Sequence, residues 1–311
     1  MSGNPAAPSG ISQEFQQIKV RYEMGIGPTL TFNNGVEMPA FGLGVFQSSK
    51  EDTADAVRTA IEAGYGLIDT AAGYQNEAEV GKGIRESGIE RSKIFITTKL
   101  RIRDFGYESA LRAFDLSLKE LEIDVVDLYL LHWPVPRDFE NTIAAWKACE
   151  RFLAEGRARA IGVCNFTPAH LATLAERSEV TPALNQIELH PFFVQADHSE
   201  AHRRLGIVTQ AWSPIGGIQR YRGDGSVERD PLSHPVVVEI AKKYGKTPAQ
   251  VVLRWQIDLG HSPIPKSVNP QRIRENADIF DFLLTAEEVS AISALDTGRR
   301  GGLDPNTHGP T

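Results

Sequence analysis

The sequence predicts an α/β fold, a single (β/α)8 TIM barrel, and three observations support that prediction. Apolar segments of strand length recur along the chain, segments with helical periodicity alternate with them, and the strand segments are too apolar for a sheet with one face in water. The 311 residues, 41% of them hydrophobic, provide enough material for a large core. Eight strand segments in one chain therefore favour a closed barrel surrounded by helices.

The elements follow in order. We expect residues 1–28 to be a disordered or loosely attached extension, because the first ten are small and polar and the rest have no clear period. Residues 29–311 form the predicted barrel domain, which opens with a small β-hairpin whose turn is Asn34-Gly35. The strand segments are residues 41–46, 66–70, 94–100, 126–133, 158–164, 182–188, 207–212 and 262–267.

Helical periodicity lies between these segments, for example at residues 51–64 and 108–122, where apolar positions recur at spacings of three and four. The alternative fold is an open, doubly wound sheet. That fold is disfavoured because "GLGVFQ", at the first strand, does not have the GxGxxG spacing of a dinucleotide-binding turn. The C-terminal tail, "TGRRGGLDPNTHGPT", is short and rich in glycine.

Composition argues against several classes of function. A net charge of −7 and a pI near 5.7 give no electrostatic footprint for nucleic acid or an anionic membrane. No apolar run approaches the roughly 20 residues of a membrane helix. The two cysteines, Cys149 and Cys164, form no disulfide framework and no CxxC metal pair. We therefore expect a cytoplasmic protein without a metal site, acting as a monomer or weak oligomer.

Four titratable side chains fall at one predicted rim of the barrel. Asp69 ends the second strand, Lys99 the third and His132 the fourth, and Tyr74 lies on the loop after the second. Each has a structural explanation alone: Asp69 could bond loop amides, and the others could pack or reach solvent. Together they are less easily explained, because a lysine that leaves an apolar strand inside a barrel needs a partner, and Asp69 is one strand away.

This group of side chains has a chemical use. A phenol has a pKa near 10, and a nearby ammonium lowers it by favouring the phenolate. A carboxylate behind the lysine would keep the lysine charged and aimed at Tyr74, and His132 could orient the oxygen that Tyr74 protonates. A tunable proton donor suits carbonyl reduction, in which the oxygen gains negative charge as hydride reaches the carbon.

Hydride transfer needs a carrier, and later strand ends could bind one. Asn165 and Gln186 offer carboxamides, and the indole of Trp212 could stack on a flat ring. After the eighth strand, Lys266 and Ser267 precede Arg272 at the start of a helix. A charge cluster alone is usually only a solvated face, but barrels often bind phosphate at this position.

Seven segments, in order, resemble motifs of the aldo-keto reductases across roughly residues 29–303: "LIDTAAGYQNE", "ITTKL", "LLHWP", "IGVCNF", "ALNQIELHP", "AWSPIG" and "IPKSVNPQRIREN". The resemblance implies a (β/α)8 barrel that binds NADPH and reduces aldehydes and ketones, with a small carbonyl compound as its only expected partner. It implies that Tyr74 is the general acid, that Lys99 and Asp69 tune it, and that His132 positions the carbonyl.

The resemblance also implies the cofactor contacts. Asn165 and Gln186 would hold the nicotinamide carboxamide, Trp212 would stack on the nicotinamide, Ser213 and Ile215 would follow the pyrophosphate, Lys266 and Arg272 would bind the 2′-phosphate, and Glu275 and Asn276 would hold the adenine. The full cofactor set is Gly44, Val45, Phe46, Asp69, Cys164, Asn165, Gln186, Trp212, Ser213, Ile215, Lys266, Ser267, Arg272, Glu275 and Asn276. The substrate set is Phe46, Tyr74, His132 and Trp133.

The chain departs from the common family pattern at a few positions. Cys164 replaces a frequent serine, and Phe46 replaces a frequent tryptophan and should form an apolar wall with Trp133. Trp212, where tyrosine is commoner, resembles the group of microbial 2,5-diketogluconate reductases and prostaglandin F synthases. The tail is shorter than the apolar tails that close the pocket in vertebrate members, which predicts a relatively open site and a broad substrate range.

Two other functions are compatible with parts of the pattern. Lys99 on a barrel strand could form a Schiff base, as in aldolases, although this leaves residues 264–276 unexplained. A binding module that retains the cofactor without turnover is the third possibility, and the intact tetrad of Asp69, Tyr74, Lys99 and His132 argues against it. We also expect residues 216–233, a long charged segment that contains glycine, to form a flap over the cofactor.

Overall fold

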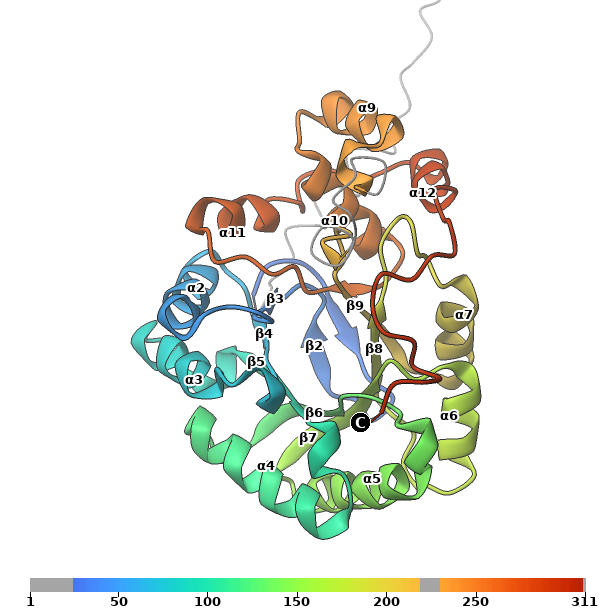
Figure 1. Ribbon diagram of the computed structural model, residues 1–311. Helices are drawn as coiled ribbons and strands as arrows, with labels where there is room; N and C mark the ends of the chain where they lie inside the picture. Colours follow the sequence, from blue (N-terminus) through green and yellow to red (C-terminus); the bar gives the residue numbers. More distant parts are fainter. Residues whose placement is uncertain (1–24, 219–229, 310–311) are drawn as a thin grey trace, which may run out of the picture.

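A computed structural model describes residues 25–218 and 230–309. The strands of one parallel sheet lie at the centre of the molecule, and the helices surround them (Figure 1). The sheet contains, in spatial as well as sequence order, β3 (Leu43–Gly44), β4 (Leu67–Asp69), β5 (Phe95–Leu100), β6 (Val126–Leu131), β7 (Ala158–Cys164), β8 (Leu184–Glu188), β9 (Val208–Trp212) and β10 (Ser262–Pro263).

Helices connect successive strands, so that neighbouring strands run parallel. The described helices are α2 (Lys50–Glu62), α3 (Glu77–Glu86), α4 (Tyr107–Leu121), α5 (Phe139–Ala154), α6 (Pro168–Ala175), α7 (Ala196–Leu205), α9 (Pro235–Tyr244), α10 (Pro248–Asp258), α11 (Pro270–Ala277) and α12 (Ala286–Ser293). The predicted helices at 51–64 and 108–122 correspond to α2 and α4. Each of the eight predicted strand segments contains one strand of the sheet.

The first and last strands meet and close the barrel. A parallel bridge joins Gly44 to Lys266, and the amide of Gly42 donates to the carbonyl of Pro263 over 3.3 Å. A side chain at Gly44 would place its Cβ 2.9 Å from the carbonyl oxygen of Ile264, so this close approach of two backbones requires glycine. The predicted (β/α)8 barrel is confirmed.

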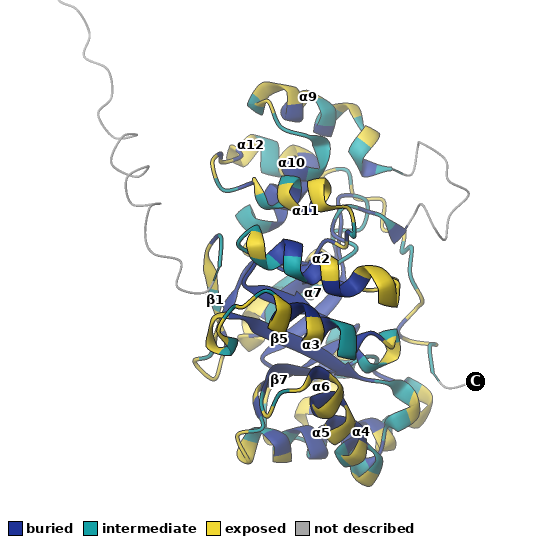
Figure 2. Ribbon diagram, turned by 90° about the vertical axis from the view of Figure 1, so that its left-hand side faces the viewer, coloured by how far each residue is buried: buried dark blue, intermediate teal, exposed yellow. Residues whose placement is uncertain are grey.

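Two separate hydrophobic cores stabilise the fold. One cluster fills the barrel itself with side chains such as Leu67, Phe95 and Leu128, whereas a larger cluster fills the layer between the sheet and the helices. Figure 2 shows the consequence: the strands of the central sheet are almost entirely buried, and the helices expose their outer faces. Strands buried on both faces explain why their sequences are continuously apolar.

The predicted hairpin closes the N-terminal end of the barrel. It consists of β1 (Thr29–Thr31) and β2 (Glu37–Pro39), paired antiparallel, and Gly35 in its turn has a φ of 84°. Met38 is completely buried in the interior cluster with Phe32. The C-terminal tail lies at the opposite end of the barrel (Figure 2). The hairpin therefore leaves the carboxyl ends of the strands as the open end.

Two of the segments predicted from the sequence lie only partly within the described residues. Residues 25–28, assigned above to the N-terminal extension, contact the barrel: the amide of Ile26 donates to the carbonyl of Gly64 over 2.8 Å. Most of the predicted flap at 216–233 lies outside the described residues. No helix within the described ranges is long and apolar enough to cross a membrane.

A buried histidine makes the stability of the fold depend on pH. His202 of α7 is completely buried, its Nε2 accepts from Nδ2 of Asn185 at 2.9 Å, and its Nδ1 lies 2.8 Å from Oγ1 of Thr209. Burial, with a smaller contribution from His198 and His261, lowers the pKa of His202 to about 3. The folded state therefore keeps this imidazole neutral at a pH where the unfolded chain protonates it.

We expect the free energy of unfolding to fall as the pH drops from 6.5 toward 4, because the unfolded chain binds this proton first. One such histidine contributes a slope of at most about 1.4 kcal/mol per pH unit. The glutamine of His202→Gln cannot titrate, so the stability of this variant should fall less steeply in acid. Its stability at neutral pH should be lower, because the substitution disturbs the hydrogen bonds to Asn185 and Thr209. Urea unfolding at a series of pH values measures both slopes, and equal slopes would contradict the prediction.

Candidate active site

A cavity of about 460 Å³ opens at the carboxyl ends of the strands and brings together most of the predicted site residues. Those that line it are Gly44, Phe46, Asp69, Tyr74, His132, Trp133, Asn165, Gln186, Trp212, Ser213, Ile215 and Lys266. Lys99 lies buried beneath the cavity floor, where it contacts two of these residues. The cavity thus forms at the end of the barrel where the active sites of this fold lie.

The ammonium of Lys99 is the centre of the site. It is completely buried and donates to Oδ1 of Asp69 at 2.6 Å, to the carbonyl oxygen of Thr70 at 2.8 Å and to the hydroxyl of Tyr74 at 3.3 Å. Burial disfavours the ammonium, but opposing interactions, the charge of Asp69 foremost, outweigh this effect, and the pKa of Lys99 is raised. Lys99 is therefore a cation at neutral pH.

The sheet register explains how these groups meet. Asp69 of β4 pairs with Thr97 of β5, and Lys99 lies two residues further along β5, so it projects from the same face of the sheet as Thr97. Tyr74 follows in a short 3-10 helix, Ala72–Tyr74. The loop that carries it is fixed by Asn76, which is buried and donates through Nδ2 to the carbonyl of Val45 at 3.0 Å.

Burial dominates the acid–base properties of the two groups that face the cavity. It raises the pKa of Tyr74 to about 12, so the lowering by Lys99 that the sequence predicted is present but outweighed, and the expectation of a lowered pKa is wrong. Burial, with the charge of Lys99 and a smaller contribution from His308, lowers the pKa of His132 to about 3. Tyr74 is therefore a protonated phenol at neutral pH and His132 a neutral imidazole, with ring centroids 5.6 Å apart.

Asn165 and Trp212 form one unit across the barrel. Nε1 of Trp212 donates to Oδ1 of Asn165 at 2.9 Å, and Nδ2 of Asn165 donates to the carbonyl of His132 at 3.1 Å. Asn165 and Ser213 have φ values of 63° and 52°, a conformation that non-glycine residues rarely adopt. Such strain is typical of positions that place side chains at functional sites.

Gln186 is held in place by Gln210, a residue that was not predicted to lie near the site. Its Nε2 donates both to Oδ2 of Asp69 at 2.7 Å and to Oε1 of Gln210 at 2.7 Å. Gln210, completely buried in β9, donates in turn to Oγ of Ser262 at 3.1 Å. Both amide hydrogens of Gln186 are thus engaged, which leaves its carbonyl oxygen as the group available to a ligand.

The tail contributes to the cavity, which differs from the expectation of an open site. Gly302 and Leu303 line the cavity, and the ring of His308 packs against Trp133 with centroids 4.4 Å apart. None of these three residues was predicted to lie at the site. Their sequence context is short and glycine-rich, so only the folded structure shows that the tail returns to the mouth of the barrel.

The predicted phosphate-binding residues lie on the β10–α11 segment. Lys266 is exposed and lines the cavity, whereas Ser267, Arg272, Glu275 and Asn276 lie beyond its wall. Within the described residues, neither Lys266 nor Arg272 forms an ion pair with a carboxylate. Two cations near the start of a helix are therefore available to an anion.

Two predicted cofactor contacts are buried under the cavity rather than exposed in it. Val45 and Cys164 are both completely buried. Burial raises the pKa of Cys164 well above that of an ordinary thiol, so the residue is a thiol and not a thiolate. The Val45 side chain packs in the cluster between the sheet and the helices and that of Cys164 in the barrel interior, and neither lines the cavity.

Comparison with known proteins agrees with this geometry. The model of the aldo/keto reductase family matches residues 38–297. Morphine 6-dehydrogenase of Pseudomonas putida is 55% identical over 90% of this chain and 95% of its own length. The 9,11-endoperoxide prostaglandin H2 reductase of Trypanosoma cruzi is 46% identical over 90% of this chain and 96% of its own length.

A solved structure gives the same result. The aldo-keto reductase of Bombyx mori, determined in complex with NADP, superposes with a TM-score of 0.81 at 36% identity and covers 88% of this chain and 94% of its own. The similarity spans the barrel and extends over the strand ends that form the cavity. The chain belongs to the aldo/keto reductase family.

Proposed function

We propose that this chain reduces aldehydes and ketones to alcohols with NADPH and that Tyr74 is the general acid. The observation that supports the proposal best is the contact of the Tyr74 hydroxyl with the buried Lys99 ammonium, 3.3 Å apart, in the wall of a cavity that His132 also lines. A phenol, a buried cation and a neutral imidazole at one rim suit a reaction in which a carbonyl oxygen gains a proton.

The residues of the cavity fit the cofactor. The free carbonyl oxygen of Gln186 can accept from a carboxamide N–H, and the indole of Trp212 offers a flat face. Lys266 and Arg272 supply two positive charges for the 2′-phosphate. The Bombyx mori relative was solved with NADP, which supports the same choice here. When bound, NADPH supplies the hydride that reduces the carbonyl carbon.

The chain's own residues then complete the reaction. Neutral His132 can donate a hydrogen bond that orients the carbonyl oxygen toward Tyr74. As negative charge develops on that oxygen, Tyr74 gives up its proton, and the phenolate that remains is stabilised by Lys99. Asp69 keeps Lys99 charged and fixed in place through one carboxylate oxygen, and the other carboxylate oxygen of Asp69 accepts a hydrogen bond from Gln186. The contacts that link Asp69, Lys99 and Tyr74 exist before substrate binds.

The substrate end of the cavity favours apolar carbonyl compounds. Phe46 packs against Tyr74 with ring centroids 5.0 Å apart, and Trp133 and Leu303 complete an apolar wall. The relatives act on substrates as different as those named in morphine 6-dehydrogenase and prostaglandin H2 reductase. We infer a broad range of apolar aldehydes and ketones rather than one substrate.

Schiff-base chemistry at Lys99 is disfavoured by the same geometry. An attacking amine needs a free lone pair, but the raised pKa of Lys99 keeps it protonated, and its hydrogens are directed at three oxygens. Borohydride should therefore trap no carbonyl compound on Lys99. The intact set of Asp69, Tyr74, Lys99 and His132 likewise argues against a module without turnover.

One prediction from the proposed function concerns the proton donor. Tyr74→Phe should lose most turnover while its affinity for NADPH stays within a few-fold, because the lost interaction acts mainly in the transition state. Steady-state reduction of an aldehyde panel and fluorescence titration with NADPH measure the two quantities. Tyr107→Phe, on α4 and outside the cavity wall, is the control. A kcat of Tyr74→Phe near that of the wild type would refute the assignment.

The second prediction concerns coenzyme choice. A charge-assisted contact to the 2′-phosphate contributes about 10- to 100-fold in affinity. Arg272→Met should therefore lower the affinity for NADPH by that factor and leave the affinity for NADH nearly unchanged. Arg274→Met removes the same charge from the same helix, where Arg274 lies 3.9 Å from Glu62, and should leave both affinities unchanged. Equal weakening of both coenzymes by Arg272→Met would mean that Arg272 supports the fold or the adenine.

A further inference from the structure

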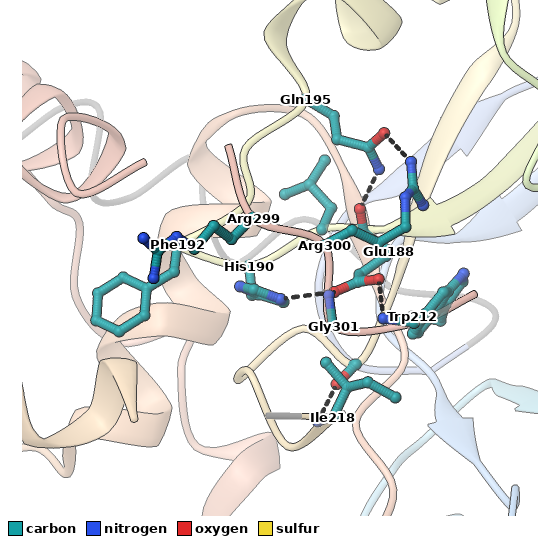
Figure 3. A network of polar contacts seen from close by, with 12 residues as sticks. Glu188, His190, Phe192, Gln195, Trp212, Ile218, Arg299, Arg300 and Gly301 are labelled. Carbon is teal, nitrogen blue, oxygen red and sulfur yellow. Dashed lines mark hydrogen bonds and ion pairs between the residues drawn. The ribbon is translucent and has the colours of Figure 1, made fainter. Parts of the chain in front are cut away.

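A buried carboxylate at the end of β8 holds the C-terminal tail (Figure 3). Glu188 is completely buried; its Oε1 accepts from the amide of Gly301 at 2.7 Å and its Oε2 from the amide of Gly302 at 2.8 Å. Nε2 of His190 lies 3.1 Å from Oε1. A buried carboxylate is costly unless hydrogen-bonded, and here two successive tail amides are among its donors.

A second set of contacts fastens the residue before these glycines. Nη2 of Arg300 donates to Oε1 of Gln195 at 3.4 Å, and its guanidinium lies 4.8 Å from the ring centroid of Phe193. The side-chain Nε2 of Gln195 donates to the backbone carbonyl of Glu188. The side chain that receives the tail arginine is therefore itself anchored at the residue that binds the tail glycines.

The fastened tail reaches two walls of the cavity. A Cβ added at Gly302 would lie 2.6 Å from Cη2 of Trp212, so the tail backbone lies directly against the indole edge. The next residue, Leu303, lines the cavity. Further along, His308 packs on Trp133. A shift of Gly301 and Gly302 away from Glu188 would thus move the apolar wall and release the edge of Trp212.

We propose that Glu188 is a positioning residue that clamps the tail over the mouth of the barrel and so sets the affinity for the carbonyl substrate. Glu188 is not part of the cavity wall, so it has no direct contact with the reacting groups. It acts through Gly301 and Gly302 on Leu303 and Trp212. This inference rests on the proposed function for its kinetic consequence, but the clamp itself is a structural property.

Two full-length variants loosen the clamp from opposite sides. Glu188→Gln removes the charge and turns one acceptor oxygen into an NH2 group that faces an amide N–H. Gly302→Ala leaves the Glu188 side chain unchanged but displaces the tail, because its Cβ would lie 2.6 Å from Cη2 of Trp212 and 2.9 Å from Oε2 of Glu188. Each should raise KM for an apolar aldehyde about ten-fold, the effect of one charge-assisted hydrogen bond, with kcat within about two-fold. Glu176→Gln, at the exposed C-cap of α6, is the matched control.

The double variant tests whether Glu188 acts through the tail. If it does, Glu188→Gln combined with Gly302→Ala should raise KM no more than either change alone, because a tail already displaced cannot be released again. Effects that multiply would overturn the proposal, since Glu188 would then act within the barrel independently of the tail. A fall in kcat with unchanged KM would overturn it as well.

The rate of proteolysis in the tail tests the contact between Glu188 and the tail without any measurement of turnover. Trypsin cleaves after arginine, and cleavage after Arg300 releases residues 301–311, a fragment identified by its mass. Both clamp variants should release this fragment at least ten-fold faster than the wild type and Glu176→Gln. Equal release rates would overturn the clamp. If no variant reduced any carbonyl compound, the proposed function would fail, and the release rates would still decide whether Glu188 holds the tail.

Discussion

The buried ion pair between Lys99 and Asp69 is the interaction on which the site depends. Removing one partner of such a pair typically costs about 3–5 kcal/mol, because the other charge is left buried and unpaired. The barrel must therefore keep both residues in register, and the β4–β5 pairing does so. The same pair fixes the position of Tyr74, whose hydroxyl accepts the third hydrogen bond of the ammonium.

Polar layers extend from this pair across the interior of the barrel. Asp69 accepts from Gln186, Gln186 donates to Gln210, and Gln210 donates to Ser262, with Met38 of the hairpin 3.9 Å from the Gln210 amide. Below this chain the interior is filled by apolar side chains. A fully connected network in a low-dielectric interior specifies one arrangement, since any broken link leaves a costly unsatisfied group.

The strands and the tetrad could be predicted from the sequence because both depend on local pattern. A strand such as "FITTKL" is buried on both faces, and a lysine near its end falls at a rim that the fold defines. The pKa of Tyr74 could not be predicted in the same way. Its direction depends on a balance between burial and the Lys99 charge, and burial is set by residues from distant parts of the chain.

The roles of Glu188 and the tail were hidden for a related reason. "NQIELHP" and "RRGGL" are separated by more than a hundred residues, and glycine amides carry no sequence signal as carboxylate ligands. Gln210 likewise looks like an ordinary polar residue in a strand. Its role emerges only when β8 and β9 pair and bring it opposite Gln186.

One rim of the barrel thus holds four titratable groups in different states. Lys99 keeps its charge because a carboxylate lies 2.6 Å away, whereas His132, only partly exposed, is kept neutral by desolvation and by the nearby cation. Tyr74 keeps its proton because burial outweighs the same cation. The Lys99 charge lowers the pKa of both neighbours, whereas burial raises the pKa of the acid Tyr74 and lowers the pKa of the base His132. Both groups are therefore neutral at the mouth of the cavity, where the proposed reduction would use one as a proton donor and the other as a hydrogen-bonding group.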